Sequence, residues 1–272
     1  MKSIYVILIL LLTFNLNAEY QESKNIFTEV TNFYHKGEID KALLKAEEIL
    51  TNSIKTKGKN DYHVAVLGDL ADLYIRLSIK QKKDPIPFLI NIVKAKIDYL
   101  VSERIALAIA DYYFKQGITR YYSSLYFYSW IKKNHVKKSL VYDDALWSSF
   151  LIYKKIKAYK HAIKELREII GTETYSIYVG SYNQTHLYDA YLEKANIEYY
   201  QLKDRKEAIK TLKRYLNTYK ENDTVDDAMF LLCKIGQDNK NKTLQQKCCD
   251  LVKNYPYSSL KKDAEKICNE IK

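Results

Sequence analysis

Apolar residues recur every three or four positions through most of the chain, which is the spacing of an amphipathic helix. Only seven glycines and three prolines interrupt the 272 residues, so few positions break such helices. The pattern predicts helices over 24–36, 39–55, 61–80, from Pro85 to about 100, 102–116, 119–134, 141–156, 158–170, 184–202, 204–220, 224–236, 241–253 and 258–271. We therefore expect an all-α chain, with a link between helices at 171–184.

One phrase recurs three times along the second half of the chain, starting at Asn134, Asn217 and Asn254. In each copy a charged helix ends, polar residues turn the chain, and an acidic residue followed by alanine starts the next helix. A related Asp-Ala pair lies between the first two copies. The alanines are Ala145, Ala190, Ala228 and Ala264, spaced by 45, 38 and 36 residues. A small residue at this position lets two helices approach closely, so the spacing predicts a repeated helix pair.

A second motif occurs in the other half of the repeat: Phe33-x3-Gly37-x-Ile39-x2-Ala42-x3-Ala46. Shorter versions occur at Tyr113-x3-Gly117 and, without the glycine, near residues 153–166 and 199–212. The glycine permits the turn conformation that ends the first helix of a pair.

Polar residues at the expected helix starts have a local structural explanation. Thr224 and either Ser258 or Ser259 are suited to cap free backbone N–H groups. The acidic pairs Asp143/Asp144 and Asp226/Asp227 fall in first turns, where negative charge suits the helix dipole. We interpret these pairs as helix-start residues and not as catalytic acids and bases.

These motifs resemble the tetratricopeptide repeat (TPR) family over nearly the whole of residues 19–272. The resemblance implies a right-handed α-solenoid of about six TPR-like helix pairs with a C-terminal capping helix. The Asn-Tyr-Pro-x-Ser…Asp-Ala phrase is similar to exported envelope proteins of the BamD-like and CpoB (YbgF)-like types. The lipidated cysteine of the first type and the coiled-coil segment of the second have no counterpart here, so neither specific role is transferred.

The first eighteen residues have the order of a signal peptide. A positive start at Lys2 precedes eleven residues, 4–14, that are apolar except Thr13, and Ala18 offers a small residue for cleavage before Glu19. A membrane-spanning helix needs about 20 apolar residues. We expect a cleaved signal peptide at 1–18, no lipidation cysteine, no span in the mature chain, and a periplasmic or otherwise exported protein; an uncleaved anchor is the alternative.

The net charge of +11 leaves the class of partner open. A positive balance suits acidic proteins, anionic lipid or peptidoglycan acids, and an exported chain is not expected to bind nucleic acid. Lysine and acidic residues alternate along the helices, so we interpret most of this charge as solvated helix surface.

Sequence motifs for catalysis, cofactors or metals are not found. No glycine-rich phosphate loop and no nucleophile elbow occurs, and the five histidines lie far apart. We expect no catalytic, cofactor-binding or metal-binding residues and no enzyme activity.

All four cysteines, Cys233, Cys248, Cys249 and Cys268, lie near the C-terminus. An even number in an exported chain suggests disulfides, with Cys233 joined to one of the adjacent pair and Cys268 to the other. Four buried thiols are the alternative, while the paired spacing of a zinc site is absent.

Candidate partner-binding residues come from two patterns. First helices of TPR pairs line the surface that usually receives peptides, which selects five residues: Tyr34, Trp147, Lys154, Glu193 and Tyr200. Tyr126 and Trp130 come from the densest aromatic run, 121–130. Such residues suit an extended acidic or aromatic segment, although each aromatic side chain could instead fill a groove between repeats.

Two functions follow from these patterns. The first is a non-catalytic periplasmic scaffold or adaptor that binds envelope proteins or peptide segments, in outer-membrane or cell-wall assembly. The alternative is a peptidoglycan- or carbohydrate-associated accessory protein that uses tyrosine and tryptophan as stacking platforms.

Overall fold

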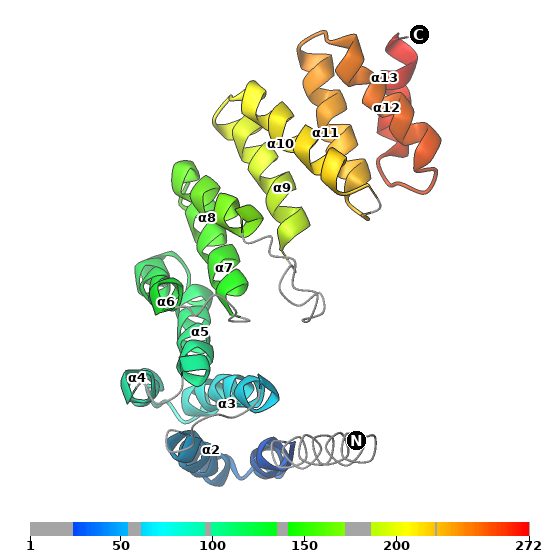
Figure 1. The fold of residues 1–272 in the computed structure, drawn as a ribbon. Coiled ribbons are helices and arrows are strands. Elements are labelled where there is room, and N and C mark those ends of the chain that lie inside the picture. The colour runs from blue at the N-terminus through cyan, green and yellow to red at the C-terminus, as the bar shows by residue number, and fades with distance from the viewer. Residues whose placement is uncertain are drawn as a thin grey trace, which may run out of the picture. The chain divides into compact units, whose positions relative to one another are not determined.

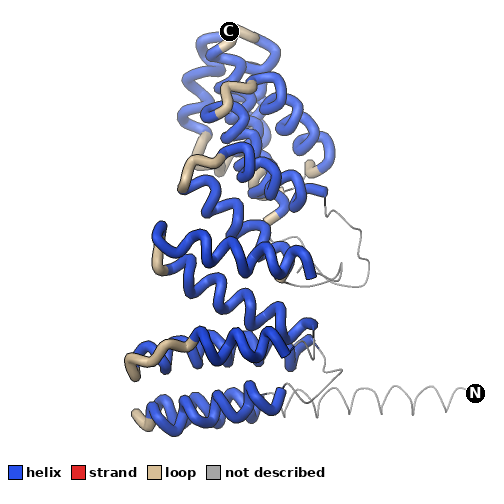
Figure 2. The backbone as a smooth tube through the Cα atoms, turned by 90° about the vertical axis from the view of Figure 1, so that its left-hand side faces the viewer, coloured by secondary structure: helices blue, strands red, loops and turns tan. Residues whose placement is uncertain are grey.

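A computed structural model describes residues 24–53, 61–95, 99–134, 141–171, 186–220 and 222–271, and its regular structure in these ranges is helical (Figures 1 and 2). The predicted all-α fold is therefore confirmed. The signal peptide expected at 1–18 and most of the link expected at 171–184 lie outside the described residues. The chain divides into two compact units, Met1–Ala145 and Leu146–Lys272, which are described separately.

The first unit is a series of helices that pack on their neighbours. A helix at 24–35 is joined to α2 (Ile39–Ser53) by an ion pair between Glu29 and Lys45, and α2 packs on α3 (Asp61–Lys80). The long helix α5 (Tyr99–Lys115) contacts both α3 and α4 (Ile86–Ala95). A 3-10 turn, η1 (Ile118–Arg120), leads from α5 into α6 (Tyr121–Asn134), which packs back on α5.

The second unit contains successive helical hairpins. Helix α7 (Tyr142–Lys155) begins just before the boundary of this unit, and α8 (Tyr159–Gly171) follows it. The next hairpin is formed by α9 (Leu187–Asn196), which continues into a π-helix, η3 (Ile197–Gln201), and by α10 (Arg205–Thr218). A third hairpin joins α11 (Val225–Asp238) to α12 (Lys242–Asn254). The last helix, α13 (Lys261–Ile271), packs on α12 and α11, which is the position expected of a cap.

Small residues hold the helix pairs close together. The four alanines of the repeated phrase are completely buried, as are Ala42 and Ala46 of the second motif. Larger apolar side chains fill the space around them, among them Leu43 and Leu50 of α2. The sequence repeat therefore corresponds to the contacts between helices, as predicted.

Turns within the hairpins use a left-handed residue. Gly37 and Gly117 have φ values of 77° and 86°, as the motifs predicted. Where glycine is missing, lysine also takes a positive φ, at Lys82, Lys157, Lys203 and Lys240. The residue after Lys240, Asn241, donates its N–H to the carbonyl oxygen of Gly236 at 2.8 Å, which closes the end of α11.

Replacing Lys240 with glycine is expected to stabilise the second unit by about 0.5 kcal/mol. A left-handed conformation costs a residue with a Cβ about 1 kcal/mol, and part of the gain is lost because glycine makes the unfolded chain more flexible. Chemical unfolding followed by circular dichroism measures the change. The control, Lys213→Gly in the interior of α10, is expected to cost about 1 kcal/mol; a loss in both variants would contradict the explanation.

Two helix boundaries differ from the sequence prediction. The helix expected to run to about 100 is described as far as Ala95, with 96–98 outside the described residues, and α5 starts at Tyr99 and not at 102. Val101 belongs to α5 because it is buried one turn before Ile105 and two turns before Ala108 and Ile109. The apolar run predicted two helices but did not locate the boundary between them.

The predicted helix at 184–202 changes type within its length. After Asn196 the backbone widens into the π-helix, in which the N–H of Leu202 donates to the carbonyl oxygen of Ile197 at 2.9 Å. At α11, Thr224 occupies the predicted cap position, but its side chain does not cap the helix. Its hydroxyl bonds Tyr215 at 2.6 Å and Asn222 at 2.9 Å instead.

Candidate functional site

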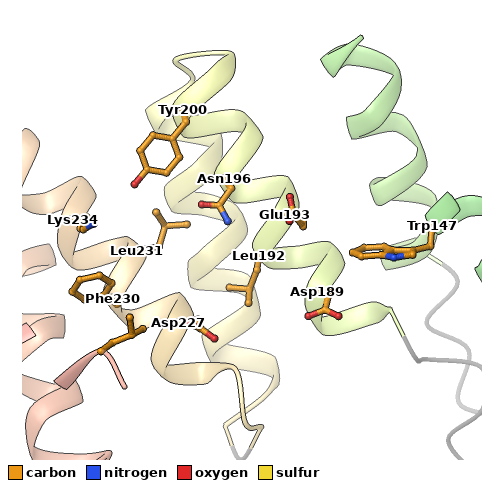
Figure 3. Close-up of a pocket in the computed structure, with 11 residues that line it drawn as sticks. Trp147, Asp189, Leu192, Glu193, Asn196, Tyr200, Asp227, Phe230, Leu231 and Lys234 are labelled. Atoms are coloured by element: carbon orange, nitrogen blue, oxygen red, sulfur yellow. The ribbon is translucent and has the colours of Figure 1, made fainter. Parts of the chain in front are cut away.

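A cavity of about 350 Å³ opens on the second unit, along the first helices of its hairpins (Figure 3). We call it the groove. Helices α9 and α11 provide most of its walls. The groove is lined by Trp147, Asp189, Leu192, Glu193, Asn196, Tyr200, Asp227, Phe230, Leu231, Lys234 and Leu260. Volumes of this size are typical of sites that receive a small ligand or a few side chains of a partner.

The internal repeat explains why these residues meet. Four lining residues of α9 and four of α11 have the same helical spacing, i, i+3, i+4 and i+7, which places each set on one face. The two sets are related by the 38-residue repeat that also relates Ala190 to Ala228. Asp189 thus corresponds to Asp227, and Leu192 to Phe230. The groove is therefore built from equivalent positions of two successive repeats.

The charged side chains in the groove differ in whether an opposite charge lies beside them. Glu193 is paired with Lys154 of α7, at 2.6 and 2.8 Å from its two carboxylate oxygens. Lys234 lies over the ring of Phe230, 5.0 Å from its centre. Burial raises the pKa of Asp227, and the negative charges of Asp226 and Asp189 raise it further. A local excess of negative charge therefore exists where the two hairpins start.

The π-helix brings Tyr200 to one end of the groove. Tyr200 is 43% exposed, and its ring meets that of Tyr199 edge to face. The hydroxyl of Tyr199 donates to Asp238 of α11, and burial together with this bond raises the pKa of Tyr199 to about 12. Insertions of this kind in helices frequently occur at functional sites. Here the widened turn holds one tyrosine against α11 and leaves the next accessible.

Trp147 forms the opposite wall. It is half-buried, and its ring stacks on that of His186 with centres 4.7 Å apart and an angle of 2°. Phe150, one turn later on α7, packs against the same tryptophan. Two neighbouring rings thus fix the indole and leave part of its surface for contact.

The structure brings together four of the seven candidate residues predicted from the sequence. Trp147, Glu193 and Tyr200 line the groove, and Lys154 binds Glu193. The prediction missed the residues of α11, although the repeat relates them to those of α9. Applying the 38-residue spacing to the α9 residues would have identified them.

The other three candidates lie in the first unit. Tyr34 accepts a hydrogen bond from Lys80 at 2.8 Å, and this contact lowers the pKa of Tyr34. Tyr126 and the half-buried Trp130 lie two turns or less from Tyr122 on α6, and Tyr122 and Tyr126 are 83% and 65% exposed. Tyr126 thus belongs to an exposed aromatic strip on α6, formed by Tyr122, Tyr126 and Trp130.

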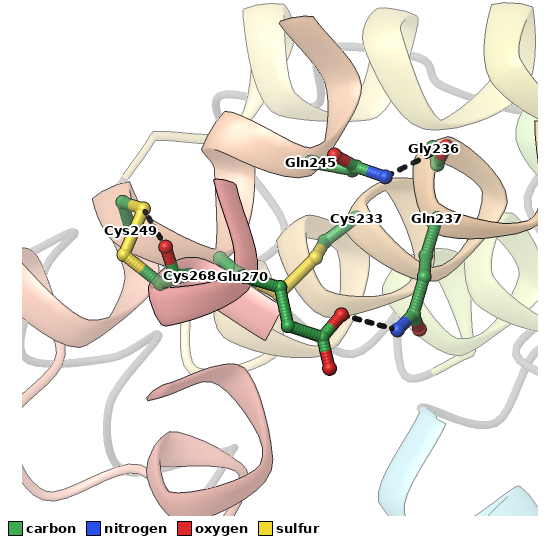
Figure 4. Close-up of a disulfide and its surroundings, with 8 residues drawn as sticks. Cys233, Gly236, Gln237, Gln245, Cys249, Cys268 and Glu270 are labelled. Atoms are coloured by element: carbon green, nitrogen blue, oxygen red, sulfur yellow. Dashed lines mark hydrogen bonds between the residues drawn. A yellow bond between two sulfur atoms is a disulfide. The ribbon is translucent and has the colours of Figure 1, made fainter. Parts of the chain in front are cut away.

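Two disulfides cross-link the last three helices (Figure 4). Cys233 of α11 is bonded to Cys248 of α12, and Cys249 of α12 is bonded to Cys268 of α13. A hydrogen bond of 3.1 Å from Gln237 to Glu270 also joins α11 to α13. These cross-links fix the end of the unit next to α11, which forms one wall of the groove.

The described residues contain neither a metal-ligating cluster nor a membrane-spanning helix. Among the described residues, no cluster of histidine, cysteine and acidic side chains has a metal-binding arrangement. Over the same ranges, no helix has both the length and the hydropathy required to cross a bilayer.

The class defined by this fold is the helical repeat protein with a groove on the first helices of its hairpins. The C-terminal part of a TPR repeat-containing protein from Cytophaga hutchinsonii is similar, with a TM-score of 0.55, 14% identity, and coverage of 89% of this chain and 87% of that chain. The chain therefore has the TPR fold, and the predicted fold resemblance is confirmed.

Other solved structures are less similar to this chain. PilW, a widely conserved type IV pilus biogenesis factor, matches with a TM-score of 0.47 and 16% identity over 89% of this chain and 98% of its own. A TM-score below 0.5 supports no inference about a shared role. No family model matches the sequence. No curated protein matches it either. The narrower resemblance to BamD-like and CpoB-like proteins stays a prediction.

Proposed function

We propose that the chain is a non-catalytic scaffold or adaptor that binds segments of other proteins in the groove of its second unit. The observation that carries this proposal is the repeated wall of α9 and α11, in which equivalent positions line one continuous surface. Leu192, Phe230 and Leu231 supply its apolar centre, while Trp147 and Tyr200 supply aromatic surface. Buried apolar centres with aromatic anchors are the surfaces from which protein partners gain most binding energy.

We also propose that the chain acts in the cell envelope after export, with envelope proteins of outer-membrane or cell-wall assembly as its partners. The signal-peptide pattern of residues 1–18 supports this proposal. The two disulfides support it as well, because such bonds persist in oxidising compartments outside the cytoplasm.

Photo-crosslinking in the native cells tests the proposal. A photoreactive phenylalanine analogue at Tyr200 is expected to give discrete adducts with one or a few envelope proteins, which mass spectrometry identifies. The matched control places the same analogue at Lys213, which is exposed on the second helix of the same hairpin. The mass of the recovered chain is expected to correspond to a start at Glu19.

The outcomes separate the parts of the proposal. Adducts from Tyr200 but not from Lys213 would support binding in the groove. Equal adducts from both positions, or none from Tyr200, would contradict it. Recovery of a chain that retains residues 1–18 from the soluble cytoplasmic fraction would contradict the proposed export but not the proposed binding in the groove.

A second candidate function rests on the aromatic strip of α6. Tyr122 and Tyr126 lie one helical turn apart and are mostly exposed, an arrangement on which sugar rings can stack. In this alternative the chain is a peptidoglycan- or carbohydrate-associated accessory protein.

Pelleting with purified peptidoglycan tests the alternative. If the strip binds glycan, the wild-type chain is expected to sediment with peptidoglycan, and the variant Tyr122→Ala/Tyr126→Ala is expected to remain in the supernatant. Tyr257→Ala removes a tyrosine that is 99% exposed elsewhere and serves as the control. Sedimentation of all three chains alike would exclude the strip as the binding surface.

A further inference from the structure

The acidic end of the groove is formed by two equivalent residues. Asp189 lies in the first turn of α9 and Asp227 in the first turn of α11, and both side chains lie at the same end of the groove (Figure 3). Within the described ranges, neither carboxylate forms an ion pair or accepts a hydrogen bond. Asp226 differs, because its carboxylate accepts the N–H of Asp227 at 3.0 Å and so serves the start of the helix.

This end stands out against the charge of the whole chain, which is +11. Burial raises the pKa of Asp227, and repulsion from the neighbouring carboxylates of Asp226 and Asp189 raises it further. A cation placed between two carboxylates would relieve their repulsion, and partial burial would strengthen the attraction.

The rest of the groove determines which side chains of a partner can lie next to that cation. Glu193 already has its partner in Lys154, so it adds little net charge. Leu192, Phe230 and Leu231 line the same groove, and Leu192 lies nearest to the acidic end (Figure 3). The groove therefore has an apolar surface near the position that a cation between Asp189 and Asp227 would take.

We propose that the groove binds an extended protein segment whose lysine or arginine enters between Asp189 and Asp227, with a neighbouring aromatic or branched apolar side chain against Leu192, Phe230 and Leu231. This inference rests on the proposed function and names the chemistry of the partner. It differs from the acidic segment that the sequence suggested, because two unpaired carboxylates lie at this end of the groove, whereas its one lysine, Lys234, lies over the ring of Phe230.

Selection from a random peptide display library on the purified full chain tests the inference. Peptides that carry lysine or arginine beside an aromatic or branched apolar residue are expected to be enriched. The best selected peptide is then labelled with fluorescein and titrated, together with its form in which norleucine replaces the basic residue. Both this replacement and the variant Asp189→Asn/Asp227→Asn are expected to weaken binding about five- to tenfold. Added salt is expected to weaken wild-type binding and to affect the double variant little.

Two control variants make the outcomes distinct. Glu207→Gln/Asp250→Asn removes the same charge from α10 and α12, outside the groove lining, and is expected to bind as wild type does. Leu192→Arg obstructs the apolar centre and is expected to abolish binding, with circular dichroism confirming that each variant is folded. Selected peptides that depend on Leu192 but lack basic residues, or that bind the Asp189→Asn/Asp227→Asn variant unchanged, would overturn the inference and leave the proposed function intact. If no selected peptide depends on Leu192, both are overturned.

Discussion

Replacing Lys194 with methionine is expected to destabilise the second unit by about 3–5 kcal/mol. Lys194 is 8% exposed and Glu198 is 2% exposed, and their charged groups lie 2.6 Å apart. Thr211 completes the cluster, because its hydroxyl accepts a hydrogen bond from Lys194 and donates one to Glu198 at 2.8 Å. Methionine would leave the buried carboxylate of Glu198 without its cation. Urea unfolding followed by circular dichroism measures the loss.

A second lysine–glutamate pair in the same unit provides the control. Lys154 and Glu193 also lie 2.6 Å apart, but their side chains are 43% and 28% exposed. Lys154→Met is therefore expected to cost less than about 1 kcal/mol. Equal losses from the two substitutions would contradict the role assigned to burial. A further variant, Lys194→Met/Glu198→Leu/Thr211→Val, removes every member of the cluster and is expected to recover most of the stability.

Gly236→Ala is expected to destabilise the second unit by about 2 kcal/mol, although alanine favours helices over glycine by about 1 kcal/mol. A Cβ at this position would lie 2.6 Å from the backbone nitrogen of Gln245 and 2.7 Å from the Cβ of Leu244. These atoms belong to the first turn of α12 and cannot rotate away. The bond between Cys233 and Cys248 also restrains α12 from moving off α11. The free energy of unfolding in urea measures the effect.

Gly171→Ala is the matched control, because a Cβ at the end of α8 would meet nothing within 4 Å. It is expected to leave stability unchanged or to raise it by a few tenths of a kcal/mol. A loss from Gly171→Ala similar to that from Gly236→Ala would mean that close approach of α11 and α12 is not the cause. The contrast separates packing from the intrinsic preference of alanine.

The helices and their pairing could be predicted because repeated small and aromatic residues carry that information locally. Ala190 and Ala228 identify equivalent helices, and Gly37 and Gly117 identify turns. The left-handed lysines could not be predicted; at Lys240 this backbone accompanies the hydrogen bond that the N–H of Asn241 donates to Gly236 at the end of α11. Local sequence favours no such backbone for lysine.

The groove was predicted only in part, for a related reason. Trp147, Glu193 and Tyr200 follow from the position of first helices in the repeat, whereas the residues of α11 require the 38-residue spacing to be applied to each lining position. The π-helix was not predicted, and it places Tyr199 against Asp238, a residue 39 positions later in the chain. The burial of Lys194 was also missed, because lysine and glutamate four residues apart usually indicate a solvated helix face.

The placement of the cysteines has a mechanical consequence. Cys248 and Cys249 are adjacent in the chain but are bonded to helices on either side, α11 and α13. A pulling force applied at the C-terminus would pass from Cys268 to Cys249, across one peptide bond to Cys248, and on to Cys233. Most of α12 and α13 would carry none of that tension. The three helices joined by the two bonds would therefore keep their length under such a load for as long as both bonds stay oxidised.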